Sequence, residues 1–242
     1  MPWSGITLIG ITLNKYQDEE ILSPFDPNIA FFYIKPDSDT CKYPNLLKEE
    51  LAAYHQISSP KRKQEFKLGR MAAKMALAQI GYTNPPPVLR GLSGEPVWPD
   101  SVSGSIAHSQ GLAIAAVSYK SVSKGIGLDI ESIEKKRDLK IFDRILTLEE
   151  RTYVHDESIL EEEKELRALT IFCAKEACFK AFFGATGKKL RFKDASFRPN
   201  INQNQMTGLL MTDTGIPEFN TGFSFKCTIT KSKSFIIAGV AL

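Results

Sequence analysis

The chain has 242 residues, of which 43% are hydrophobic and 24% are charged, a composition typical of folded globular proteins with a sizeable core. Its net charge of +3 is too small to indicate nucleic-acid binding by itself, and no apolar run reaches the length of a membrane span. The four cysteines fit no zinc site, and residues 1–16 lack the basic start of a secretory signal. We therefore expect a cytoplasmic protein with no nucleic-acid or membrane partner.

The first third of the chain predicts short strands and two helices. Strands are expected at residues 3–13 and 30–34, where β-branched and aromatic residues gather. A short helix is expected over residues 46–54. A second helix is expected from Pro60 to about Ile80, because a serine followed by proline is a helix start signal.

This second helix carries a strongly basic surface. We expect Lys61 and Lys74 to be solvated, as most charged side chains in such runs are. Arg70 differs because it follows Gly69, and a glycine inside a helix costs about 1 kcal/mol and usually has a packing or ligand reason. The basic surface consists of Lys61, Arg62, Lys63, Lys67, Arg70 and Lys74.

An apolar hairpin is expected next, with strands over residues 104–109 and 111–118. His108 and Ser109 are its polar exceptions. His108 is either a structural histidine with satisfied hydrogen bonds or a donor to a bound phosphate. Residues 121–124 follow as the hinge between two halves of the chain.

The strand expected over residues 125–131 carries the pattern on which the functional interpretation depends. Its side chains alternate between two faces, so the carboxylates of Asp129 and Glu131 share a face with Gly127. Carboxylates about 7 Å apart repel each other, and a hard cation such as Mg²⁺ would remove that repulsion. Gly127 leaves this face uncrowded for a bulky ligand. The alternative is a strand whose polar face meets water.

Later in the chain, one helix is expected over residues 141–154, an acidic mobile connection over 155–164 and a long helix over 166–183. At 100° per residue, Glu176 of the long helix lies in the middle of an apolar stripe, which is a costly place for an unpartnered carboxylate. A weak i,i+4 pair with Lys180 is one explanation.

The other explanation is that Glu176 is a third metal ligand beside Asp129 and Glu131.

Strands are then expected over residues 195–198, 207–211, 222–229 and 235–242. Because no regular βαβ repeat occurs, these elements predict an α+β fold with mostly antiparallel sheets.

Two motifs resemble the 4′-phosphopantetheinyl transferase superfamily. Gly127-Leu128-Asp129-Ile130-Glu131 is followed about 45 residues later by Ala174-Lys175-Glu176-Ala177-Cys178-Phe179-Lys180, and the two motifs at this separation are specific. Residues 94–99, residues 104–109 and Gly69-Arg70 resemble the larger, two-lobed branch of the surfactin-synthetase-activating and enterobactin-synthetase-component type.

The resemblance implies two similar lobes related by a pseudo-twofold axis, residues 1–123 and 124–242, each a small sheet packed on a long helix. It implies transfer of the 4′-phosphopantetheine arm of coenzyme A to a serine of an apo acyl- or peptidyl-carrier protein. The products are the holo-carrier protein and adenosine 3′,5′-bisphosphate. A Mg²⁺-dependent monomer that acts in secondary metabolism or siderophore synthesis is expected.

The resemblance also implies roles for single residues. Mg²⁺ is expected on Asp129, Glu131 and Glu176. Glu176 or Glu150 is expected to accept the serine proton, and Lys180 to stabilise or protonate the leaving phosphate. The contacts expected with coenzyme A are Arg62, Arg70, His108, Ser109, Lys175 and Lys180.

Three residues depart from the family pattern. Phe172 stands where tryptophan usually begins the helix motif. Ala107 stands where serine or threonine usually precedes the matched histidine, so that phosphate contact is lost or falls to Ser105 or Ser109. Glu95 replaces a basic residue often found before the loop proline. Two other functions stay open: a different metal-dependent phosphoryl-transfer enzyme, such as a nucleotide hydrolase, and a non-catalytic protein that binds coenzyme A or a carrier domain.

Overall fold

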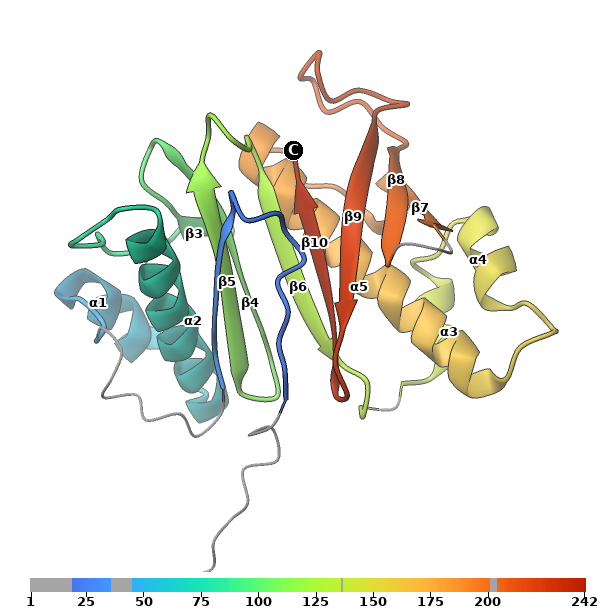
Figure 1. The fold of residues 1–242 in the computed structure, drawn as a ribbon, viewed down its shortest axis with the longest axis horizontal. Helices are drawn as coiled ribbons and strands as arrows, with labels where there is room; N and C mark the ends of the chain where they lie inside the picture. The colour runs from blue at the N-terminus through green and yellow to red at the C-terminus, as the bar shows by residue number, and fades with distance from the viewer. Residues whose placement is uncertain (1–18, 36–44, 136, 201–203) are drawn as a thin grey trace, which may run out of the picture.

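The computed structural model of the chain describes residues 19–35, 45–135, 137–200 and 204–242. The strand expected at residues 3–13 and the thiol of Cys41 lie outside this part. The described residues form an α+β fold with antiparallel sheets, as the sequence predicts. Figure 1 shows the strands side by side, with α2 at one end of the row and α5 behind it.

Two main sheets and a small ribbon make up the strands. The first sheet has the order β1-β5-β4 and the second the order β6-β10-β9-β8-β7. The strands of the first sheet are β1 (Ala30–Ile34), β4 (Val102–Ser109) and β5 (Leu112–Tyr119), and the ribbon is β2 (Leu89–Arg90) with β3 (Pro96–Val97). The strands of the second sheet are β6 (Ile126–Ser132), β7 (Ala195–Asn200), β8 (Gln205–Leu210), β9 (Ser224–Lys231) and β10 (Phe235–Ala241).

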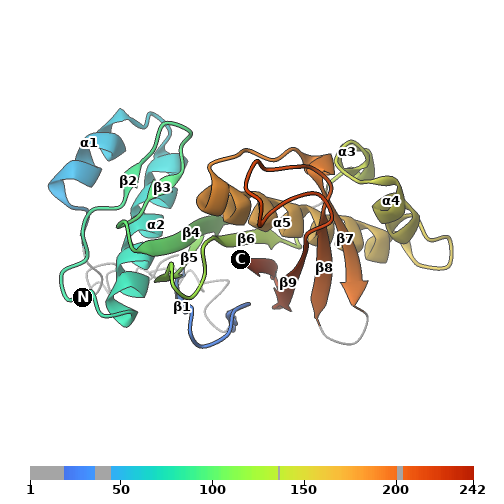
Figure 2. The same ribbon diagram turned by 90° about the horizontal axis from the view of Figure 1, so that it is seen from above.

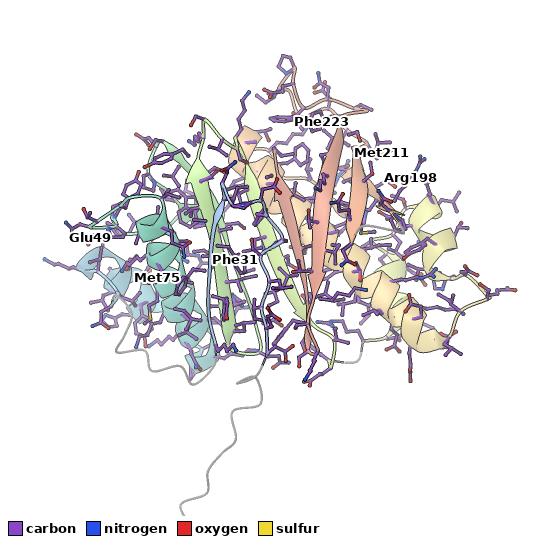
Figure 3. All side chains as sticks on the ribbon, viewed as in Figure 1. Phe31, Glu49, Met75, Arg198, Met211 and Phe223 are labelled. Atoms are coloured by element: carbon purple, nitrogen blue, oxygen red, sulfur yellow. The ribbon has the colours of Figure 1, made fainter. Side chains whose placement is uncertain are left out.

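The described residues form five α-helices. They are α1 (Lys48–Gln56), α2 (Pro60–Gln79), α3 (Leu139–Asp143), α4 (Leu148–Val154) and α5 (Glu161–Thr186). Of these, α2 packs on the first sheet and α5 on the second, while α1 lies against α2, and α3 and α4 lie against α5. Figure 2 shows α3, α4 and α5 on one side of the second sheet and α2 at the end of the first. The side chains that fill the layers are drawn in Figure 3. Within the described ranges, no helix combines the length and the apolar character needed to cross a bilayer.

Helix α2 begins where the sequence predicts. Pro60 is its first residue, and the Ser59 hydroxyl accepts a hydrogen bond from the Arg62 N–H at 3.4 Å. Gly69 is needed for packing, since a Cβ there would lie 2.9 Å from the Ile106 side chain of β4. The expectation that Lys74 is solvated is wrong, because its side chain is buried against α1.

The second half of the chain differs from expectation at two helix ends. The single helix expected over residues 141–154 is two short helices, because Thr147 caps a new helix start. Its hydroxyl accepts the Glu150 N–H at 3.3 Å, and the Glu150 carboxylate accepts the Thr147 N–H at 2.7 Å. Helix α5 begins at Glu161, so the connection expected over residues 155–164 ends inside a helix.

The two sheets meet along β4 and β6 through side chains. The Ile126 N–H donates to the Ser103 hydroxyl and the Leu128 N–H donates to the Ser105 hydroxyl, both at 3.0 Å. A shared apolar cluster reinforces this joint, and Phe31 of β1, labelled in Figure 3, packs against it. The cluster contains Ala107, Leu112, Ile114, Ala116, Ile126, Leu128, Ile130, Phe235 and Ile237, together with Ile21 and Ile29.

The segment expected to be a hinge is held in place on both sides. Ser123 is buried, and its hydroxyl lies 3.1 Å from the carbonyl oxygens of Gly125 and Leu242. The Lys124 N–H donates to the Leu242 carbonyl at 2.6 Å. The division of the chain at residues 123 and 124 stays a prediction, and these contacts join its two sides.

Helix α5 packs directly on the backbone of β6. A Cβ at Gly127 would lie 1.7 Å from the Ala177 carbonyl oxygen, and a Cβ at Gly125 would lie 2.2 Å from that of Ala181. The interpretation that Gly127 leaves space for a ligand is therefore wrong, since the helix backbone fills that space. The glycines instead set how closely α5 approaches the strand that carries Asp129.

We expect Gly127→Ala to lower the free energy of unfolding by about 1–3 kcal/mol or more, because backbone on both elements must move to admit the methyl group. Urea denaturation measures this change. Gly184→Ala is the matched control, since a Cβ at Gly184 has its nearest neighbour at 4.0 Å and alanine favours the helix. Equal stability of the two variants would contradict the role assigned to Gly127.

Candidate functional site

A cavity of about 690 Å³ lies between the two halves of the described fold. Residues 93–98 and 102–106, with Lys120, form its N-terminal side. Its C-terminal side is formed by Glu176, Phe179, Lys180, Phe183, Lys189 and Leu190. The cavity therefore combines aromatic walls with three lysines and two carboxylates, those of Glu95 and Glu176.

Asp129 and Lys180 form an ion pair beside this cavity. The Lys180 ammonium lies 2.8 Å from Asp129 Oδ1 and donates to the Leu128 carbonyl at 2.9 Å. Burial is the largest single influence on Lys180 and lowers its pKa, but the charge and hydrogen bond of Asp129 and the charge of Glu176 together raise it, and the net shift is upward. Asp129 is 8% exposed, and its Oδ2 has no hydrogen-bond partner in the described structure. One buried oxygen of this carboxylate is thus an acceptor that no hydrogen bond in the described structure satisfies.

Glu131 also has a cationic partner. Its carboxylate accepts a hydrogen bond from the Arg137 guanidinium, which comes from the segment after β6. Burial and the neighbouring charge of Asp129 raise the pKa of Glu131, and Arg137 opposes this shift. The repulsion expected between the two strand carboxylates is therefore present, and each carboxylate has its own cation.

Glu176 faces the cavity from α5. Burial and then the charge of Asp129 raise the pKa of Glu176, while Lys180 lowers it, so the Glu176 and Asp129 carboxylates influence each other. The apolar stripe expected around Glu176 is confirmed in part, since Phe179 and Phe183 line the same cavity as Glu176. They form a wall of this cavity, whereas the side of α5 turned to the core carries Lys175.

Among the residues that the structure describes, no three His, Cys, Asp or Glu side chains are grouped so that they could hold a metal ion. The donor chemistry nevertheless suits Mg²⁺, which prefers carboxylate oxygens. The unpartnered Oδ2 of Asp129 is such an oxygen, and Glu131 on the same strand and Glu176 on α5 carry other carboxylate oxygens.

Comparison with known proteins identifies the family of the chain. The family model described as the 4′-phosphopantetheinyl transferase N-terminal domain matches residues 49–118, and that of the 4′-phosphopantetheinyl transferase superfamily matches residues 125–230. The 4′-phosphopantetheinyl transferase Npt of Nocardia iowensis is 34% identical over 163 residues, which are 65% of this chain and 69% of the relative. The chain belongs to the 4′-phosphopantetheinyl transferase superfamily, which is a family of enzymes.

Two further relatives lie in the same superfamily. The 4′-phosphopantetheinyl transferase PptT of Mycobacterium tuberculosis is 33% identical, over 62% of this chain and 64% of the relative. Enterobactin synthase component D of Escherichia coli K12 is 39% identical, over 52% of this chain and 57% of the relative. The enterobactin-synthetase-component type named from the sequence motifs is therefore among the matches.

Two residues expected at the transferase site lie in the core instead. Glu150 and Lys175 are 0% exposed and form an ion pair at 3.0 Å. Lys175 also donates to the carbonyls of Phe192 and Ala195 at 2.6 Å, and Glu150 accepts the Phe197 N–H at 2.9 Å. Since neither side chain lines the cavity and both are satisfied by protein atoms, the structure gives them a structural task.

The two arginines expected near coenzyme A also lie outside the cavity wall. Arg62 is exposed on α2. Arg70 donates to the carbonyls of Val88 and Leu89 at 2.7 and 3.3 Å, and burial lowers its pKa to about 10. Its guanidinium thereby anchors the segment before β3 to α2.

His108 lies at the exposed end of β4, with its side chain 44% exposed and Nδ1 3.7 Å from a Glu65 carboxylate oxygen. Burial lowers the pKa of His108, Glu65 raises it, and the charge of Lys180 lowers it, so His108 lies within electrostatic reach of the site. Ser109 is half-buried at the end of the same strand. The roles of His108 and Ser109 in phosphate binding stay predictions.

Sequence reasoning missed several residues around the site. Trp98, Lys120 and Lys189 line the cavity, and Arg137 pairs with Glu131. Trp98 had a signal, since Gly104 opposite leaves room for its ring: a Cβ there would lie 2.7 Å from the indole. The lysines had none, because a solvated lysine and a cavity lysine have the same local sequence pattern.

We expect Lys175→Met to lower the free energy of unfolding by about 3–5 kcal/mol, because it leaves the buried Glu150 carboxylate without its cation. Chemical denaturation monitored by circular dichroism measures this. Lys124→Met is the control, since Lys124 pairs with Glu218 on the surface and such pairs contribute about 0–1 kcal/mol. A small effect on stability with a large effect on turnover would contradict the structural assignment.

Proposed function

We propose that the protein transfers the 4′-phosphopantetheine arm of coenzyme A to a serine of an acyl- or peptidyl-carrier protein. The observation that carries this proposal is the cavity between the two halves, into which Glu176 and Lys180 project from α5 beside Asp129. Family membership supplies the reaction class, and the side chains in the cavity supply groups that this reaction needs.

The cavity suits a long ligand that is anionic in one part and apolar in another. Lys120, Lys180 and Lys189 provide positive charge for phosphate groups. Trp98, Phe179 and Phe183 provide apolar walls for the uncharged arm. Coenzyme A has both kinds of part, which is why we propose it as the co-substrate.

The chain also offers a carboxylate set for Mg²⁺. We propose that Asp129, Glu131 and Glu176 hold this ion. When bound, the metal neutralises negative charge on phosphate oxygens of the substrate. Asp129 contributes its unpartnered Oδ2, while its Oδ1 keeps Lys180 in position.

The transfer requires one proton acceptor and one cation for the leaving group. The carrier serine oxygen attacks the phosphorus that bears the pantetheine arm, and its proton passes to Glu176, which we favour over the buried Glu150. The bond from that phosphorus to the oxygen of the adenosine-bound phosphate breaks, and adenosine 3′,5′-bisphosphate leaves. Lys180 stabilises the negative charge that develops on this leaving oxygen.

The test is to incubate the protein with coenzyme A, Mg²⁺ and several apo carrier proteins, and to weigh each carrier by mass spectrometry. The expected result is a carrier heavier by one phosphopantetheine group. Release of adenosine 3′,5′-bisphosphate without any carrier would indicate a nucleotide hydrolase. Binding of coenzyme A with neither product would indicate a non-catalytic binding protein.

We expect Lys180→Met to lower the turnover number about 10²–10³-fold, since it removes the cation that stabilises the leaving phosphate. Initial rates of carrier modification measure the effect. Lys61→Met is the matched control, because this side chain is 76% exposed on α2 and far in sequence from the site. An equal rate in Lys180→Met and the control would contradict the role of Lys180.

The two-lobed organisation is part of the same proposal. In each half, a glutamate at the third position of a short helix pairs with a lysine of the long helix: Glu50 with Lys74 at 2.5 Å and Glu150 with Lys175 at 3.0 Å. Each glutamate also accepts a backbone N–H from a segment near a strand, Val88 or Phe197. These matching clusters support a pseudo-twofold relation between residues 1–123 and 124–242.

The setting of the reaction is likewise proposed. A role in siderophore or other secondary metabolism is supported by relatives named enterobactin synthase component D. A monomer in the cytoplasm is the simplest form compatible with a cavity to which one chain contributes both sides.

A further inference from the structure

Arg137 is held beside the candidate site by three acceptors. Its Nη2 donates to the Glu131 carboxylate, and its Nη1 donates to the carbonyls of Ser132 and Lys135 at 3.1 and 3.2 Å. The side chain is 17% exposed. The guanidinium is thus oriented by backbone as well as by the carboxylate.

The two carboxylates of β6 each carry one cation of a different kind. The Lys180 ammonium lies on Asp129, and the Arg137 guanidinium lies on Glu131. A guanidinium stays protonated at all physiological pH values, so it cannot lose its charge when another cation approaches. A divalent ion that binds Glu131 therefore meets a permanent positive charge on the same carboxylate.

The structure offers Arg137 another partner set. Arg137 also lines a second cavity of about 280 Å³, whose other charged residues are Lys135, Glu134 and, on α5, Glu162 and Glu165. If Nη2 leaves Glu131, Nη1 can keep its two backbone carbonyls, and the cavity gives the guanidinium acidic neighbours. Displacement of Arg137 from Glu131 therefore does not leave its guanidinium without acidic neighbours.

We propose that Arg137 and the divalent cation compete for the Glu131 carboxylate, so that Arg137 sets how tightly the site binds metal. This inference rests on the proposed function, because it takes Asp129, Glu131 and Glu176 as the metal ligands. Arg137 acts through Glu131 and is a positioning residue.

The test measures binding of Mn²⁺ by electron paramagnetic resonance and titration calorimetry, first alone and then with coenzyme A, without a carrier. Arg137→Gln is expected to bind Mn²⁺ at least about fivefold more tightly than the unchanged protein, as for a typical coupling between two sites. Arg191→Gln is the control, because this 88%-exposed arginine contributes the same charge away from β6.

Thermal unfolding gives a second readout. With a chelator present, Arg137→Gln is expected to melt at a lower temperature than the unchanged protein. The Glu131 carboxylate then lacks the Arg137 guanidinium, which otherwise offsets its repulsion from Asp129. The rise in melting temperature on adding Mn²⁺ is expected to be larger in this variant than in the unchanged protein.

A further variant avoids changing Arg137. Glu162→Gln with Glu165→Gln removes the alternative acidic partners, so Mn²⁺ binding is expected to weaken. In the Arg137→Gln background, the same double change is expected to weaken Mn²⁺ binding less, because no guanidinium then has to move into the second cavity.

Several results would overturn the inference. Unchanged or weaker Mn²⁺ binding by Arg137→Gln, in a protein that still binds Mn²⁺ and modifies carriers, would refute competition and leave the proposed function intact. Absence of Mn²⁺ binding by all forms, with or without coenzyme A, would refute the proposed metal site and this inference together.

Discussion

The close contact between α5 and β6 is the constraint on which the site depends. Gly125 and Gly127 have no side chain at the points where the helix carbonyls of Ala181 and Ala177 come nearest. This approach brings the Lys180 ammonium onto Asp129 and the Leu128 carbonyl. Two acidic positions of the strand and two functional positions of the helix are thereby fixed by backbone packing, which is stiffer than any arrangement of side chains alone.

Charge balance around this contact is local. The buried Asp129 carboxylate is paired with Lys180 and the half-buried Glu131 carboxylate with Arg137, so each has a cation within the protein. Glu176 has Lys180 four residues later on the same helix and remains at the cavity wall. The site therefore has one carboxylate that lines the cavity, while each of the two strand carboxylates is paired with a cation.

Much of the fold follows from local sequence signals. The Ser59-Pro60 start of α2 and the hydrophobic alternation of β6 were predictable, because capping and side-chain alternation are short-range effects. The proximity of Glu176 to Asp129 was predicted from a carboxylate in the middle of an apolar stripe, whereas the Asp129–Lys180 ion pair was not predicted, since the two residues lie on different elements. The split between α3 and α4 was missed because the hydroxyl cap of Thr147 competes with a helical pattern that continues past it.

The errors at charged residues share one physical cause. Lys74, Lys175 and Glu150 are buried in pairs whose partners lie distant in the sequence, and no local pattern distinguishes such a residue from a solvated or catalytic one. Gly127 was misread for a related reason. A missing side chain signals that something comes close, but the sequence does not reveal whether a ligand or a helix does.

The hydrogen bonds between β4 and β6 have a consequence for how the spacing of the two sheets can change during evolution. Hydrogen bonds of a regular ladder join backbone to backbone, and a substitution removes one only when it introduces proline, which has no N–H. Here the hydroxyls of Ser103 and Ser105 accept the hydrogen bonds in place of backbone carbonyls, so these bonds depend on two side chains that a substitution can remove. Exchange of a single serine for alanine would loosen the seam while each sheet keeps its own ladder, which gives evolution a direct means to tune the width of the space between them.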